Sequence, residues 1–217
     1  MNSSTESTQE GYRQLLTRQK FHTIKAGLQE YRLSEFIRQV EAKKGAGKGT
    51  VLPFIRGLRF SALLIYAIRE FLSGSGLTAS WGHLMDENGR LCSPECDIII
   101  HREGHMMRWN GDGGDKPVMD FKFIECENAL VVISCKSYLI PSQIDTDYAD
   151  DLKKYVSNVW LFAECSQVGK LDVIKEKSLE LGYSAFWTLY TWDRSNNDVV
   201  DCLDHWDNFV VTLKGLV

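Results

Sequence analysis

The spacing of apolar residues changes from helical to strand-like about one third of the way along the chain. Over residues 53–72 the apolar positions fall at i, i+3, i+4 and i+7, which predicts one amphipathic helix with a proline in its first turn. Residues 11–44 show a weaker helical pattern with basic side chains between the apolar ones, and residues 43–50 have the glycine and lysine content of a linker. We therefore expect a helical, basic extension with its linker over residues 1–49 and a folded domain over residues 50–217.

Short apolar runs then alternate with helical patterns through the rest of the sequence. A turn at residues 86–89 is expected to join the first two of these runs as a hairpin. The expected strands lie at residues 78–85, 96–101, 121–124, 129–134, 159–163 and 185–192, and the expected helices at residues 146–156, 171–181 and 205–216. Strands and helices in this order predict an α/β domain with a mixed sheet.

Charge is divided unevenly along a chain whose formal net charge is −4. Residues 1–60 hold 11 Lys/Arg against 5 Asp/Glu, whereas residues 61–217 hold 14 against 24. A basic segment on an acidic body is compatible with binding to phosphates, which the net charge alone argues against. The basic residues expected to contact phosphate are Arg13, Arg18, Lys20, Lys25, Lys43, Lys44 and Lys48.

Composition restricts the setting in which the protein works. A chain with 44% hydrophobic and 25% charged residues is typical of folded soluble proteins, and these fractions exclude the collagen-like and disordered classes. The N-terminal residues are polar and do not resemble a signal peptide, and the longest apolar run, around residues 62–68, is too short to span a membrane. The 6 cysteines are too sparse for a disulfide framework. We expect a cytoplasmic protein with reduced thiols and no membrane partner.

Two charged residues stand where a sheet normally buries apolar side chains. Asp97 begins one apolar strand, and Lys136 ends another. Burying either charge is costly unless the charge has a partner or a function. Ser134 and Lys136 share one face of their strand, while Cys135 faces the other side and offers its main-chain carbonyl. If the two strands are neighbours, Asp97, Ser134 and Lys136 converge at one edge of the sheet.

This arrangement resembles the PD-(D/E)XK nuclease superfamily, in a bacterial branch of unassigned function. The resemblance rests on the helix ending at residues 68–72, the hairpin at 82–89, Ser-Pro-Glu-Cys-Asp-Ile-Ile-Ile at 93–100 and Val-Ile-Ser-Cys-Lys-Ser at 132–137. It covers about residues 50–165 and implies a restriction-endonuclease-like mixed β-sheet core flanked by helices. It also implies a metal-dependent endonuclease in bacterial defence or restriction, with DNA rather than RNA as its partner, and a homodimer in members that cut both strands.

The resemblance assigns roles to individual residues. Asp97 is implied to bind Mg²⁺ or Mn²⁺, and Cys135 to offer its carbonyl to the same ion. Lys136 is implied to orient the attacking water and to offset negative charge in the transition state. Ser134 departs from the family pattern, because an acidic residue usually stands there and a neutral hydroxyl is a poor ligand for Mg²⁺. A structural ion pair between Asp97 and Lys136 is the alternative interpretation.

The missing acid has several candidate replacements. Some restriction endonucleases of the superfamily that carry serine supply the acid from the next helix, and Asp150 lies fourteen residues after Lys136. Asp150 is therefore the expected second metal ligand, although acidic residues also favour a helix N-terminus without any metal. Glu70 is another candidate, either as a catalytic acid on the first core helix or as a surface residue. Glu125 and Glu127 precede the central strand and reach the metal only in a different register.

Two further hypotheses compete with a nuclease. Ser134 is also compatible with a nuclease-fold protein that has lost catalysis and binds nucleic acid or protein. Aromatic residues near the C-terminus suggest a base-stacking surface, for which core packing is the alternative. These residues are Phe186, Trp187, Tyr190, Trp192 and Trp206.

Overall fold

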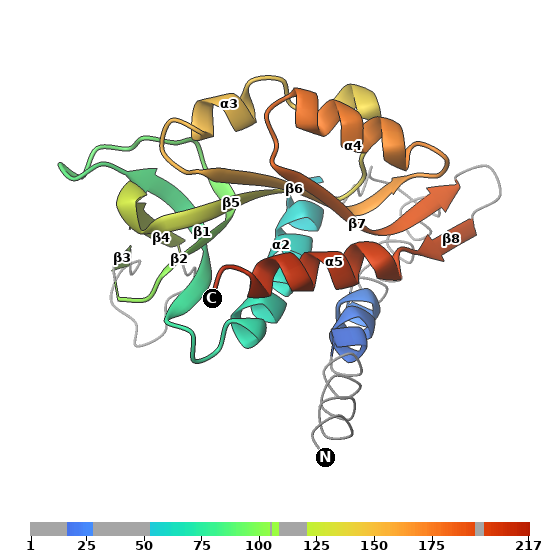
Figure 1. Cartoon of the computed structure of the whole chain (residues 1–217), viewed down its shortest axis with the longest axis horizontal. Coiled ribbons are helices and arrows are strands. Elements are labelled where there is room, and N and C mark those ends of the chain that lie inside the picture. The colour runs from blue at the N-terminus through green and yellow to red at the C-terminus, as the bar shows by residue number, and fades with distance from the viewer. Residues whose placement is uncertain (1–16, 28–52, 105, 109–120, 194–197) are drawn as a thin grey trace, which may run out of the picture.

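The computed structural model describes residues 17–27, 53–104, 106–108, 121–193 and 198–217 (Figure 1). Residues 17–27 form a helix. The other helices are α2 (Pro53–Phe71), α3 (Tyr148–Leu152), α4 (Leu171–Glu180) and α5 (Leu203–Lys214), with short 3₁₀ turns η1 (Cys126–Asn128) and η2 (Pro141–Gln143). The strands are β1 (Leu77–Met85), β2 (Cys96–Arg102), β3 (Met106–Arg108), β4 (Phe121–Glu125), β5 (Ala129–Lys136), β6 (Asn158–Gln167), β7 (Ala185–Asp193) and β8 (Asp198–Asp201).

The described strands form one mixed sheet of eight strands in the order β3-β4-β1-β2-β5-β6-β7-β8. β2 runs antiparallel to both of its neighbours, β1 and β5, whereas β5, β6 and β7 run parallel to one another. α3 and α4 cover one face of the sheet, and α2 and α5 cover the other (Figure 1). These layers confirm the predicted mixed sheet flanked by helices.

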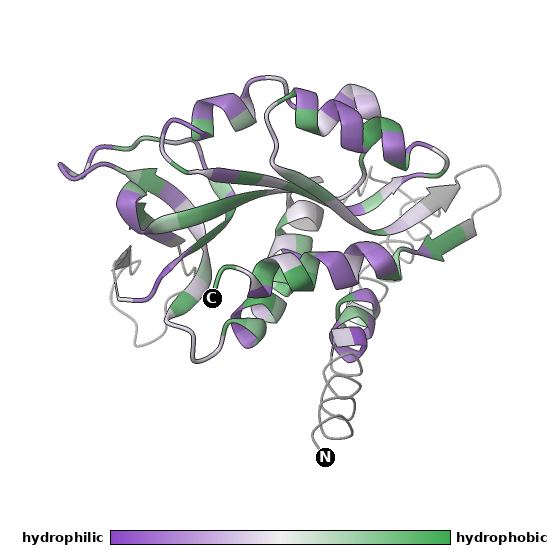
Figure 2. Ribbon diagram, viewed as in Figure 1, coloured by the Kyte–Doolittle hydropathy of each residue, from purple (hydrophilic) through white to green (hydrophobic). Residues whose placement is uncertain are grey.

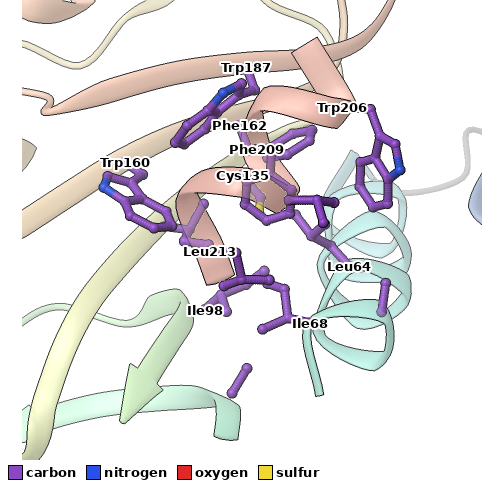
Figure 3. Packing of buried hydrophobic residues seen from close by; sticks show 14 of the residues in the cluster. Leu64, Ile68, Ile98, Cys135, Trp160, Phe162, Trp187, Trp206, Phe209 and Leu213 are labelled. Carbon is purple, nitrogen blue, oxygen red and sulfur yellow. The ribbon is translucent and has the colours of Figure 1, made fainter. Parts of the chain in front are cut away.

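Each face of the sheet buries its own hydrophobic core, because side chains alternate along the strands. On β5, Val131 and Cys135 point to the side of α2 and α5, while Val132 points to the side of α3 and α4. The first core holds most of the buried aromatic rings (Figure 3), and there Phe162 and Phe209 meet edge to face with ring centroids 4.8 Å apart. Figure 2 shows hydrophobic residues along β5, β6 and β7 and many hydrophilic residues on α3 and α4.

The aromatic residues near the C-terminus belong mainly to these cores. Phe186, Trp187, Tyr190 and Trp206 are each at most 6% exposed. Rings this deeply buried stabilise the fold through contact with one another and are not available to stack on bases. The side chain of Trp192 lies outside the described part of the chain. Core packing is therefore the interpretation that the structure favours for this group.

The helix over residues 17–27 is joined to the core of the domain. Phe21 and Ile24 are buried, and the indole N–H of Trp206 donates a hydrogen bond of 2.9 Å to the carbonyl of Thr17. The helical character expected for the N-terminal part is confirmed for this stretch, and the remainder of the expected extension lies outside the described residues. Because this helix supplies core side chains, its removal is expected to destabilise the domain.

Departures from the expected elements occur where local pattern is weak. The helix expected at 146–156 is reduced to α3, because the chain turns after Leu152 to bury Val156 before β6 begins. β8 has four residues, too few to show a period, and it forms by pairing with the end of β7. β3 lies in a stretch for which no strand was expected. Within the described ranges, no helix has both the length and the apolar character needed to cross a bilayer.

Candidate active site

A bulge in β2 sets the position of Asp97. Ser80 on β1 pairs with Ile99, and Gly82 pairs with Cys96, so β2 advances three residues while β1 advances two. The extra residue of β2 therefore lies at or next to Asp97. Bulges of this kind redirect a side chain and recur beside functional sites. Here the irregularity interrupts strict alternation at the position that the family pattern assigns to the metal ligand.

The register between β2 and β5 brings Asp97 to the end of β5. Ile98 pairs with Ile133 in the antiparallel ladder, and one further step along each strand places Asp97 opposite Ser134. The Asp97 carboxylate accepts a hydrogen bond of 2.7 Å from the main-chain N–H of Cys135. The expectation that these two strands are neighbours is confirmed. Two segments far apart in the sequence therefore meet at one point of the sheet.

Cys135 takes part in the site through its main chain. Its thiol is buried on the α2 side, and this burial raises the pKa of the thiol well above its usual value. The N–H and C=O of one residue in an extended strand point to the same edge of that strand. Because the N–H of Cys135 points to Asp97, its carbonyl also faces the β2 side. This is the direction that a main-chain metal ligand requires.

The negative charge of the Asp97 carboxylate is only partly offset by the groups around it. Burial raises the pKa of Asp97 above its usual value, and the Cys135 N–H and the Lys136 ammonium lower it in turn. The charge of Glu95 raises it further. Lys136 forms no ion pair with another described residue, although its charge acts on Asp97. Asp97 and Lys136 thus share one site without neutralising each other in a close salt bridge.

Two tyrosines that sequence reasoning missed lie beside this site. Tyr148 interacts with Cys96 and Tyr183 with Ser134, and the charge of Asp97 acts on both tyrosines. Both hydroxyls are buried, and neither makes a hydrogen bond of standard geometry with the described residues. Burial raises the pKa of Tyr183 to about 12 and that of Tyr148 well above its usual value. The available signal was an aromatic residue inside the acidic run that precedes and forms α3.

The candidates for the second acid are dispersed. In the described part of the chain, no group of three His, Cys, Asp or Glu side chains is suited to hold a metal ion. Asp150 lies in α3 against Gly182, where an added Cβ would stand 2.3 Å from its Oδ1. Glu70 forms an ion pair with Lys20. Neither carboxylate is among the charges that act on Asp97, and their roles as metal ligand and catalytic acid remain predictions.

Glu125 and Glu127 lie at the other end of β5. They flank the turn η1, which precedes the strand, whereas Ser134 and Lys136 end it. The Glu125 carboxylate also accepts a hydrogen bond of 3.0 Å from Asn128. Glu127 lies before the strand begins, and the extended stretch from Ala129 to Ser134 alone is roughly 17 Å long. The observed register therefore keeps both carboxylates away from Asp97.

The donor groups at Asp97 fit a divalent cation held by few protein ligands. Mg²⁺ commonly takes one or two carboxylates, keeps several waters and binds substrate phosphates. Asp97 and the Cys135 carbonyl supply such a partial set, and the Ser134 hydroxyl adds little to it. The incompletely compensated charge of Asp97 is the observation that favours a cation, because a bound ion would offset it.

The basic residues expected to contact phosphate are partly engaged within the protein. Lys20 forms its ion pair with Glu70, and Lys25 Nζ lies 2.5 Å from Asp201 Oδ1. Arg18, on the same helix, is exposed. The remaining four, Arg13, Lys43, Lys44 and Lys48, lie outside the described residues. The expected phosphate-contacting role of this segment stays a prediction.

Solved structures with the same fold exist, although no family model and no curated protein matches the sequence. The cAAA-bound form of NucC from P. aeruginosa ATCC27853 matches with a TM-score of 0.60 and 11% identity, over 93% of this chain and 90% of that one. The cAAA-bound form of E. coli MS115-1 NucC matches with a TM-score of 0.60 and 9% identity, over 93% of this chain and 89% of that one. The apo form of the same protein matches with a TM-score of 0.50 and 9% identity, over 71% of this chain and 82% of that one. NucC is a PD-(D/E)XK-type nuclease of phage-defence systems, so the predicted nuclease fold is confirmed.

Proposed function

We propose that this protein is a metal-dependent endonuclease that hydrolyses phosphodiester bonds in DNA, as part of bacterial defence. The observation that carries the proposal is the convergence of Asp97, the Cys135 main chain and Lys136 where β2 meets the end of β5. The shared fold with NucC, over nearly the whole of both chains, supports the reaction class and the defence setting by analogy. We also propose a homodimer, the assembly that the family resemblance implies for members that cut both strands of DNA.

Each group at the site has a role in this reaction. Asp97 and the Cys135 carbonyl would hold Mg²⁺ or Mn²⁺, with water and substrate oxygens as the other ligands. The ion supplies Lewis-acid stabilisation of the phosphoryl oxygens when it is bound. Lys136 orients the attacking water and offsets the negative charge that develops on the phosphate. Ser134 presents a neutral hydroxyl where the family pattern has an acid.

Metal removal tests the proposal directly. We expect supercoiled plasmid to be nicked or linearised in Mg²⁺ or Mn²⁺, to stay intact in EDTA, and to be cut again when metal is restored. Single-stranded DNA and RNA are assayed in parallel, and we expect RNA to stay intact. Every assay is run with and without cAAA, the ligand named for the NucC structures. If no substrate is cut under any of these conditions, the protein is not a nuclease.

A second candidate function is binding of nucleic acid without cleavage. The observation that favours it is the dispersal of the acidic residues. No group of three metal-binding side chains forms among the described residues, Asp150 lies against Gly182, and Glu70 pairs with Lys20. A single carboxylate holds a divalent cation weakly. In this case the protein would retain the fold and a phosphate-binding surface but not the chemistry.

Replacing Ser134 with aspartate separates the two functions. Because Ser134 stands opposite Asp97, we expect S134D to add a second metal ligand. The Mg²⁺ concentration for half-maximal cleavage should then fall about tenfold, a typical effect of improving the surroundings of a metal. The measurement is plasmid cleavage against Mg²⁺ concentration, with S134A as the variant that removes the hydroxyl without adding charge. If wild type and S134D both bind DNA and neither cuts it, binding without cleavage is the function.

A further inference from the structure

A cleft lies between α2 and β1, on the side of the sheet that α2 covers. Its volume is about 340 Å³, which is within the range of small-ligand sites. α2 lines it with Leu58, Ile65 and the ring of Tyr66, and β1 lines it with the ring of Trp81. The cleft is therefore largely apolar, with one aromatic ring from each of the two elements.

Strand pairing places this cleft beside Asp97. The bulge in β2 leaves Trp81 of β1 opposite Asp97 and Ile98. The indole N–H of Trp81 donates a hydrogen bond of 2.7 Å to the carboxylate of Glu95, which precedes Asp97 by two residues. Trp81 therefore belongs both to the cleft and to the neighbourhood of the candidate metal ligand.

Both aromatic rings of the cleft are accessible. Tyr66 is 59% exposed, and Trp81 is partly exposed. The ammonium group of Lys20 lies 5.6 Å from the centroid of the Tyr66 ring, so the helix over residues 17–27 contacts this ring. Accessible rings that line a common cleft are typical of ligand sites, whereas the buried aromatic residues of the sheet stabilise the core.

The chemistry of the cleft favours a nucleobase over an apolar peptide. A base is flat and aromatic, and any of the four bases stacks on tyrosine or tryptophan. Arg69 also lines the cleft, and its Nε–H donates a hydrogen bond of 2.7 Å to the carbonyl of Ala79, which holds the guanidinium there. A positive charge at an apolar cleft complements a ligand that carries both aromatic rings and phosphates, and an apolar peptide offers no partner for that charge.

We propose that the cleft binds an unpaired nucleobase of the DNA strand that passes Asp97, with Tyr66 and Trp81 as the stacking residues. This inference rests on the proposed function, which supplies DNA as the partner. A base held in the cleft fixes one nucleotide beside Asp97 and so orients the adjoining phosphate. Bases of a fully paired duplex are enclosed by pairing and stacking, so the cleft favours single-stranded or locally unpaired DNA.

DNA binding in EDTA tests the role of the two rings. The dissociation constant is measured by fluorescence anisotropy for a labelled single-stranded oligonucleotide and for an abasic oligomer of the same length, which keeps the sugars and phosphates but has no bases. We expect Y66A and W81A each to weaken binding of the base-bearing strand roughly tenfold, within the range for stacking on one ring. Binding of the abasic oligomer should stay at its wild-type value. Y66F keeps the ring and should bind both oligomers as wild type does.

Tyr155 provides the matched control. It is 39% exposed, follows α3 and does not line the cleft, so we expect Y155A to leave both dissociation constants unchanged. Tryptophan fluorescence gives a second readout, because a base stacked on an indole quenches its emission. The base-bearing strand should quench wild type and should quench W81F less. Because Tyr66 is exposed, Y66A should melt at the wild-type temperature.

The outcomes separate this inference from the proposed function. If Y66A and W81A bind the base-bearing strand as tightly as wild type, or weaken binding of both oligomers equally, the cleft does not hold a base. If sedimentation shows that Y66A instead dissociates a wild-type oligomer, the cleft is an interface between copies of the chain and the inference is wrong. If wild type binds DNA and never cuts it, the endonuclease proposal fails, and the two oligomers still decide the role of the cleft. If wild type binds no DNA in EDTA or in Mg²⁺, both proposals fail.

Discussion

Replacing Asp97 with asparagine is expected to abolish cleavage and to raise the thermal stability of the metal-free protein. The loss of activity follows from the loss of the carboxylate that the structure places at the end of β5. Metal stabilisation of a phosphoryl transition state is worth several kcal/mol, so the cleavage rate should fall by about 10²-fold or more. The asparagine Oδ1 still accepts the hydrogen bond from the Cys135 N–H, so the fold is expected to remain intact.

The gain in stability follows from the direction of the Asp97 pKa shift. Burial raises the pKa of Asp97 in the folded state above its value in the unfolded chain. The favourable contribution of protonated Asp97 to the free energy of unfolding is therefore fully present below the pKa that Asp97 has in the unfolded chain. This contribution is lost as the pH rises through the pKa that Asp97 has in the folded protein. Asparagine resembles the protonated acid at every pH. Metal-free D97N should melt above wild type at neutral pH, and the difference should shrink toward acid pH.

Glu95 supplies the control for this prediction. It is an exposed acid two residues from Asp97, and its carboxylate accepts a hydrogen bond of 2.7 Å from Trp81. E95Q removes one negative charge from the same neighbourhood, and we expect it to cut DNA like wild type. Melting curves in EDTA and plasmid cleavage in Mg²⁺ are the two measurements. A D97N protein that melts below wild type at neutral pH would indicate that Asp97 stabilises the fold through a structural ion pair with Lys136.

The elements that the sequence predicted well are those in which the spacing of apolar residues follows from burial in a core. The stripe of α2 and the apolar runs of β2 and β5 appear in the structure close to their expected bounds, because each is set by contact with one or both cores. β6, by contrast, continues four residues past its expected end at residue 163. β8 was not predicted, because four residues with aspartate at each end show no alternation of apolar and polar positions. The length of α3 was overestimated, because the polar residues after Leu152 resemble a continued helix although the chain turns there to bury Val156.

The site was predictable as far as it depends on strand pairing. Asp97 and Lys136 were recognisable because charges are rare at the ends of buried strands, and the register of β2 with β5 then brings them together. Tyr183 was not recognisable, since its position depends on the turn at Gly182 and on how α3 lies over the sheet. The location of a second acid depends on the same tertiary details, so no spacing rule along the chain could fix it.

Replacing Lys136 with methionine is expected to lower the cleavage rate by about 10²- to 10³-fold, while the affinity for DNA changes much less. The ammonium group acts on the attacking water and on charge that develops during the reaction, and one such group typically contributes a factor of this size. Methionine keeps most of the volume of the lysine side chain, and Lys136 is only partly buried, so the fold should tolerate it.

The same substitution has a second readout that does not depend on catalysis. The charge of Lys136 lowers the pKa of Asp97, so its removal should raise that pKa further. Titration of the Asp97 carboxyl by carbon-13 NMR in EDTA should therefore move to higher pH in K136M, whereas K136R should leave it near its wild-type position. K153M is the matched control, because Lys153 is exposed just after α3 and does not act on Asp97. An unchanged Asp97 titration in K136M would show that the two residues do not share a site, and a loss of cleavage in K136M would then need another cause.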